Sequence, residues 1–102
     1  MEISSLRIIL AQLDPLIPTG VTIKGAMILL EIYMDEGRRI THYNDLIEGK
    51  IPSTSAYISR FEKAGLLIKA VDDTSLRGSA KLVVLTPKGR KILNEIFADV
   101  AR

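Results

Sequence analysis

The feature that most constrains the fold is a pair of short apolar runs, separated by a polar turn and followed at once by a helix start. Residues 66–71 (LLIKAV) and 81–86 (KLVVLT) are rich in aliphatic and β-branched side chains, which favour strands. The segment between them contains aspartate, serine and glycine, which favour turns. Thr86 caps a helix that Pro87 opens, since proline is favoured in the first helical turn. The sequence therefore predicts an antiparallel hairpin leading directly into a last helix.

Four helices and one short extended segment are predicted before the hairpin. Apolar spacing and capping residues place them at 3–13, 23–34, 42–49 and 53–64, with the extended RRIT segment before the third. Thr22, Thr41 and Ser53 are the predicted N-caps, because their side chains can accept a bond from the first helical turn. Gly37 and Gly49 are predicted where the second and third helices end, because glycine readily adopts the left-handed conformation found there.

The second helix is predicted to bury a stripe of large apolar side chains. Helical spacing places the stripe at Ile23, Met27, Leu30 and Met34. Three further apolar side chains widen this face, and they are Ile28, Leu29 and Ile32.

The order helix, helix, short strand, helix, helix, strand, strand, helix is that of a winged helix-turn-helix, an α+β fold. At 102 residues, we expect one domain spanning 1–102, with the hairpin at about 66–86 as its wing. The terminal helices at 3–13 and 87–100 would then flank the helix-turn-helix and its wing.

Composition excludes several classes of function. The chain has no cysteine and a single histidine, His42, so disulfides, thiolate zinc sites and multi-histidine metal sites are excluded. No glycine-rich phosphate loop or catalytic triad is present, and we expect neither an enzyme nor a bound cofactor. Apolar runs are shorter than the roughly 18 to 20 residues of a membrane span. We expect a cytoplasmic protein, in the host cytoplasm if a virus or plasmid encodes it.

Charge is distributed unevenly along the chain. Residues 1–49 hold four basic and seven acidic side chains, whereas residues 50–91 hold nine basic and three acidic ones. A basic block of this kind favours a polyanionic partner, although a solvated basic surface is the alternative. Fourteen isoleucines against three Asn or Gln residues are also typical of heat-adapted proteins.

The helix at 53–64 has the two faces that a DNA-reading helix needs. Thr54, Ile58, Phe61 and Gly65 fall on one side and are predicted to face the core. Small, hydroxylated or basic residues fall on or beside the other side, and they are Ser53, Ser55, Ala56, Tyr57, Ser59, Arg60 and Lys63. Short side chains let a helix enter the major groove, and arginine can bind guanine through two bonds. Tyr57 either contacts the DNA backbone or closes the edge of the core.

The run from Ser53 to Leu93 resembles winged-helix transcription regulators of the MarR/SlyA type. The sequence FEKAGL at 61–66 and LTPKG at 85–89 match motifs that flank the wing in those proteins. The resemblance implies that Arg77 enters the minor groove, with Ser79 and Lys81 beside it. Solvation of the hairpin tip is the alternative role for Arg77. PadR-like and ArsR-like regulators share much of the pattern.

The sequence departs from this family in two respects. Asp72 and Asp73 precede Arg77 by several residues rather than closely, and Ser79 and Lys81 stand where a second arginine is usual. The terminal helices are also shorter than those of the family, so a small-molecule effector is not favoured.

The terminal helices carry apolar stripes that could pack across a two-fold axis, as in the resembling family. The predicted dimerisation residues are Leu6, Ile9, Leu10, Leu13, Ile92, Leu93, Ile96, Phe97 and Val100. The leading hypothesis is thus a homodimeric regulator that binds specific double-stranded DNA. A winged-helix module that binds another protein is the alternative.

Overall fold

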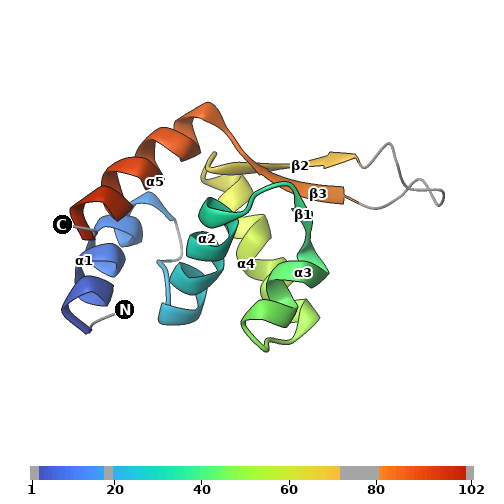
Figure 1. Ribbon diagram of the computed structural model, residues 1–102, viewed down its shortest axis with the longest axis horizontal. Coiled ribbons are helices and arrows are strands. Elements are labelled where there is room, and N and C mark those ends of the chain that lie inside the picture. The colour runs from blue at the N-terminus through green and yellow to red at the C-terminus, as the bar shows by residue number, and fades with distance from the viewer. Residues whose placement is uncertain (1–2, 18–19, 72–80, 101–102) are drawn as a thin grey trace.

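The structure is a computed structural model that describes residues 3–17, 20–71 and 81–100 (Figure 1). The elements follow the predicted order, with one additional 3-10 turn. They are α1 (Ile3–Leu13), η1 (Asp14–Leu16), α2 (Ile23–Met34), β1 (Arg38–Arg39), α3 (Ile40–Leu46), α4 (Ile51–Lys63), β2 (Leu67–Val71), β3 (Lys81–Leu85) and α5 (Pro87–Val100). The predicted winged helix-turn-helix fold is confirmed.

The three strands form one antiparallel sheet in the order β1-β3-β2. Leu67 lies opposite Leu85 and Val71 opposite Lys81, so β2 and β3 are paired along their whole length. In Figure 1 this pair extends away from the helices at one end of the molecule, while α1 and α5 lie side by side at the other end. The helix-turn-helix of α3 and α4 lies between them.

A single apolar core joins the helices to the sheet. It takes Ile9 and Leu13 from α1, and Leu93 and Ile96 from α5. The remaining large side chains come from the middle of the fold, and they include Ile28, Leu29, Ile32, Tyr43, Ile58, Phe61, Leu67 and Val83. In the part of the chain that is described, no helix has the length and apolar character needed to cross a membrane.

The predicted apolar face of α2 is buried only in part: Ile28, Leu29 and Ile32 lie in the core as predicted, but the main predicted stripe does not. Ile23, Met27 and Met34 are 53%, 44% and 64% exposed, and Leu30 is half-buried. The buried residues of α2 are Gly25, Ala26, Ile28, Leu29 and Ile32. Because α2 is apolar on nearly all sides, spacing alone could not show which side packs against the neighbouring helices.

Two predicted helix starts were also wrong. α4 begins at Ile51 rather than after Ser53, because Pro52 is favoured in a first turn, where its missing N–H costs nothing. α3 begins at Ile40, directly after β1, so Thr41 lies inside the helix and does not cap it. α3 ends at Leu46, before the predicted Gly49.

Other predicted turn and cap residues are confirmed. The Thr22 side chain accepts a hydrogen bond from the Gly25 backbone N–H at 3.2 Å. Thr86 Oγ1 accepts from the Gly89 N–H at 2.9 Å, and Pro87 is the first residue of α5. Gly37, just beyond α2, has a φ of 87° that favours glycine.

Candidate nucleic-acid interface

The outward side of α4 presents small and basic side chains to solvent. We define its outer face as Ser53, Ala56, Arg60 and Lys63, all of which are exposed. On the opposite side Thr54, Ile58 and Phe61 are buried, as predicted. The small side chains around Arg60 leave its guanidinium accessible. A partner could therefore approach the helix closely along this face.

Four predicted residues meet around a hollow of about 180 Å³ on α4, and these are Ser53, Ala56, Tyr57 and Arg60. The guanidinium carbon of Arg60 lies 5.4 Å from the centre of the Tyr57 ring. At this distance the ring attracts the cation and restrains the arginine side chain. The Tyr57 hydroxyl is in turn 2.6 Å from Thr22 Oγ1. Tyr57 therefore supports Arg60 from the side while it connects α4 to the start of α2.

Ser55 and Ser59 are half-buried and flank the outer face. Ser59 Oγ accepts a hydrogen bond from Lys69 Nζ at 3.2 Å, and the same ammonium lies 3.7 Å from Glu62 Oε1. Lys69 was not among the residues predicted for this region. It is the only charged side chain in β2, and this was the signal that could have drawn attention to it. Lys69 offsets the negative charge that Glu62 brings to α4.

The wing contributes one described residue among those predicted to contact DNA. Lys81 is exposed at the start of β3, opposite Val71 of β2. Arg77 and Ser79 lie outside the described residues.

Two side chains of α3, Asn44 and Tyr43, fix the helix relative to its neighbours through three hydrogen bonds. Thr54 Oγ1 donates to Asn44 Oδ1 at 2.7 Å, and both side chains are buried. The buried Tyr43 donates its hydroxyl hydrogen to the Asp35 carbonyl at 2.7 Å and accepts from the Arg38 N–H at 3.2 Å. The orientation of α4 therefore depends on directional bonds as well as on apolar packing.

The predicted dimerisation residues lie mostly inside the single chain. Five are buried in the core, and these are Ile9, Leu13, Leu93, Ile96 and Phe97. Leu10 and Ile92 are half-buried and pack against that core. Leu6 lies in α1 and Val100 in α5, and their side chains are outside what the structure describes.

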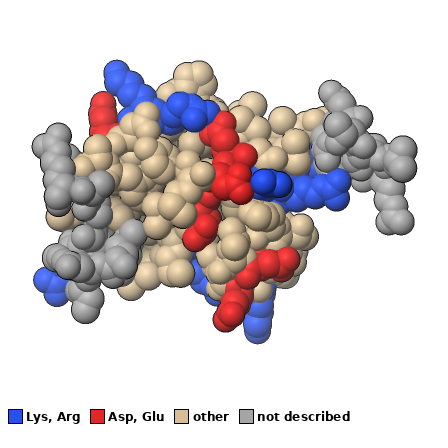
Figure 2. Space-filling view, viewed as in Figure 1, with Lys and Arg blue, Asp and Glu red and all other residues tan. Residues whose placement is uncertain are grey.

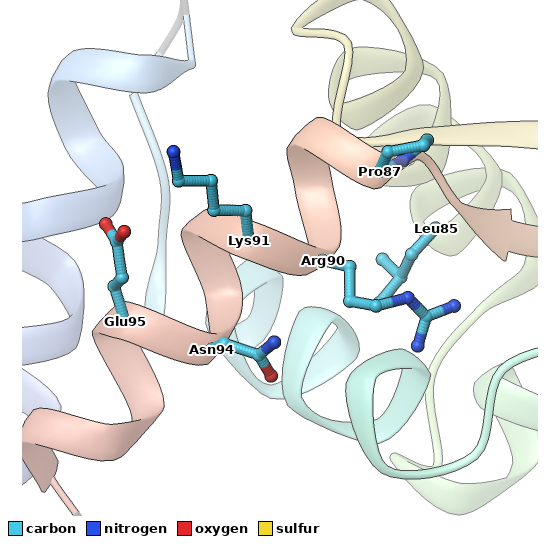
Figure 3. A pocket seen from close by; sticks show the side chains of 6 residues that line it. All are labelled: Leu85, Pro87, Arg90, Lys91, Asn94 and Glu95. Carbon is cyan, nitrogen blue, oxygen red and sulfur yellow. The ribbon is translucent and has the colours of Figure 1, made fainter.

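A larger hollow of about 540 Å³ lies along α5, and none of its lining residues belongs to α4 (Figure 3). Its lining residues are Leu85, Pro87, Arg90, Lys91, Asn94 and Glu95. Two of these residues bond to α2 or to the segment that follows it. Asn94 Oδ1 accepts from the hydroxyl of Tyr33 in α2 at 2.5 Å, and Arg90 pairs at 2.5 Å with Glu36, which lies between α2 and β1. These bonds show that one wall of the hollow serves to join α5 to α2 and to the segment that leads from α2 into β1.

The sheet, the α3–α4 pair and the β2–β3 hairpin together define a winged helix-turn-helix protein. Solved structures similar to this chain include MarR-family transcription regulators. A MarR regulator from Methanosarcina mazei Go1 superposes with a TM-score of 0.75 at 19% identity, over 96% of this chain and 66% of its own. MepR, a transcription regulator of the Staphylococcus aureus multidrug efflux pump MepA, superposes with a TM-score of 0.74 at 16% identity. The match covers 96% of this chain and 69% of MepR. Reduced AbfR bound to DNA superposes with a TM-score of 0.72 at 14% identity, and the match covers 94% of this chain and 66% of AbfR.

The likeness confirms the predicted resemblance at the level of the fold. No family model matches the sequence, and no curated protein matches it either. The chain spans about two thirds of the length of these solved structures.

Proposed function

We propose that this protein is a transcription regulator that binds specific double-stranded DNA as a homodimer. In this proposal the outer face of α4 enters the major groove, and Arg77 of the wing enters the neighbouring minor groove. Narrow minor grooves attract arginine because their negative potential is concentrated. Two half-sites about one helical turn apart would match the two-fold symmetry of the dimer. Such a regulator would act in the cytoplasm of its cell or host.

The observation that carries the proposal is the placement of Arg60 on α4. Its guanidinium is exposed, is surrounded by small side chains, and is restrained against the Tyr57 ring. A restrained guanidinium loses less conformational freedom when it binds a guanine edge through two bonds. Among solved structures of the same fold, AbfR has been captured on DNA, which also favours this use of the fold.

The test compares Arg60 with Lys63, its neighbour on the same face. A duplex is first selected from a random pool, and binding is then measured by mobility shift over a range of salt concentrations. Arg60→Ala should cost about 1 to 3 kcal/mol and relax base preference at one position in each half-site. Lys63→Ala should weaken binding to all sequences alike. It should also reduce the slope of the logarithm of the binding constant against the logarithm of salt concentration by about 1.

The matched control is Lys91→Ala, which removes an exposed lysine from α5. It should leave duplex binding unchanged. Wild-type protein that binds no duplex, random or selected, would refute the proposal and favour a module that binds another protein. Selected duplexes that Arg60→Ala binds as tightly as wild type would show that the outer face of α4 is not the reading surface.

A further inference from the structure

The exposed side of α2 is an uninterrupted apolar stripe. Ile23, Met27, Leu30 and Met34 recur at helical spacing, and three of them are exposed. In Figure 2 a broad uncharged surface covers α2, beside a strip of acidic side chains. Single exposed apolar residues are ordinary, but a continuous stripe on one helix face is typical of an interaction surface. A helix that faced only water would carry charge at these positions.

The two charged residues of α2 suit this face to a second copy of itself. Lys24 is exposed and Glu31 half-buried, and both flank the stripe on the same side, two helical turns apart. Among the described residues, neither side chain forms an ion pair. A two-fold contact requires a surface that is complementary to itself. A stripe flanked on one side by a positive charge towards its start and a negative charge towards its end meets this requirement.

Antiparallel packing about an axis near residue 28 brings these groups together. Met27 then lies opposite Leu30 of the partner subunit, and Ile23 lies opposite Met34 of the partner subunit. Because the rotation keeps both flanks on one side, Lys24 comes within reach of Glu31 of the partner subunit. The symmetry repeats the ion pair, so each contact contains it twice.

We propose that the exposed face of α2 is a homodimer contact in which two copies pack antiparallel. This contact would be the interface of the homodimer proposed above. It rests on the proposed DNA-binding function only for its biological purpose. α2 has 12 residues and is therefore about 18 Å long. A contact of that length is smaller than the roughly 800 Å² per partner of a stable complex, so we expect a dissociation constant of about 1 to 100 μM.

The first experiment measures self-association of the full chain by sedimentation equilibrium, without DNA. Met27→Lys should weaken association by about tenfold or more, because it places a charge at the centre of the stripe. Ile68→Lys is the matched control, because Ile68 of β2 is 50% exposed against 44% for Met27. It should associate like wild type. Equal weakening by both variants, or a wild-type chain that stays monomeric, overturns the proposal.

The second experiment tests the antiparallel register by charge reversal. Lys24→Glu and Glu31→Lys should each weaken association, because each places like charges opposite one another. An equimolar mixture of the two variants should recover it as a heterodimer, in which both ion pairs are restored with reversed sign. Circular dichroism of each variant confirms that the fold is kept. A mixture that associates no better than either variant alone overturns the register.

These measurements separate the two proposals. A monomeric chain that still binds a half-site duplex in mobility shift would overturn the α2 contact and leave the DNA-binding proposal standing. A chain that dimerises through α2 but binds no duplex would overturn the DNA-binding proposal and leave the α2 contact standing.

Discussion

The Tyr57 hydroxyl lies 2.6 Å from Thr22 Oγ1, and this contact joins the first turn of α2 to the middle of α4. Tyr57→Phe keeps the ring under Arg60 but removes the hydrogen bond. We expect the free energy of unfolding to fall by about 0.5 to 1.5 kcal/mol, as for a typical intramolecular bond. Urea denaturation measures this change. Duplex binding should change little, since the ring still supports Arg60. A large loss of DNA affinity with unchanged stability would show instead that the hydroxyl contacts DNA.

The buried hydrogen bond from Thr54 to Asn44 should contribute more to the free energy of unfolding than an exposed bond does. Thr54→Val keeps the shape of the side chain but leaves Asn44 Oδ1 without its donor in the core. A buried polar group that loses its partner costs about 1 to 3 kcal/mol. Ser53→Ala is the control, since Ser53 is the exposed neighbour and its loss should stay within about 0.5 kcal/mol. Equal unfolding free energies for the two variants would indicate that Asn44 finds another partner.

Gly89 is required where α5 crosses the segment that leads into β2. A Cβ at this position would lie 1.8 Å from the Leu66 carbonyl oxygen and 2.6 Å from its carbon. Alanine favours a helix over glycine by about 1 kcal/mol, but the steric overlap with the Leu66 backbone would cost far more free energy than this. We expect Gly89→Ala to destabilise the fold by about 3 kcal/mol or more.

Thermal unfolding checks this prediction, with Lys88→Ala as the neighbouring exposed control. The control should change stability by no more than about 0.5 kcal/mol. Only a shift of α5 away from Leu66 could accommodate the new side chain. A Gly89→Ala variant as stable as wild type would therefore show that α5 can move.

The sequence predicted the elements better than it predicted their faces. The hairpin and the final helix were predictable because their signals are local. These signals are the strand-forming residues, the cap at Thr86 and the proline at position 87. The buried side of α2 was predicted only in part, because both Met27 and Ile28 lie on apolar faces and only the neighbouring helices decide which of them is buried. That exposed face is the basis of the proposed α2 contact.

At the candidate site, the sequence placed Arg60 and Tyr57 on or beside the outward side of α4. It did not predict the bonds from Tyr57 to Thr22 and from Thr54 to Asn44, because these join residues that are distant in the chain. Nor did it indicate that Lys69 reaches Ser59. Periodicity shows which way a side chain points along one element, whereas a partner on another element depends on how the two are packed.

Alkaline pH should destabilise the protein through Tyr43. Burial raises the pKa of Tyr43 above its ordinary value of about 10, and the bond from the Arg38 N–H opposes this only in part. As pH rises above about 10, the unfolded chain loses the tyrosine proton first and so binds fewer protons than the folded chain. The stability linked to this group is therefore complete below pH 10 and is lost as pH rises through the higher pKa of the folded state.

The measurement is urea unfolding at a series of pH values from neutral to alkaline. Tyr43→Phe should be less stable at neutral pH, because it loses bonds to Asp35 and Arg38, but its stability should fall less steeply at alkaline pH. Tyr57→Phe is the control, since Tyr57 is only half-buried, and it should keep the steep alkaline fall. If Tyr43→Phe fell as steeply as wild type, another group would be responsible for the alkaline loss.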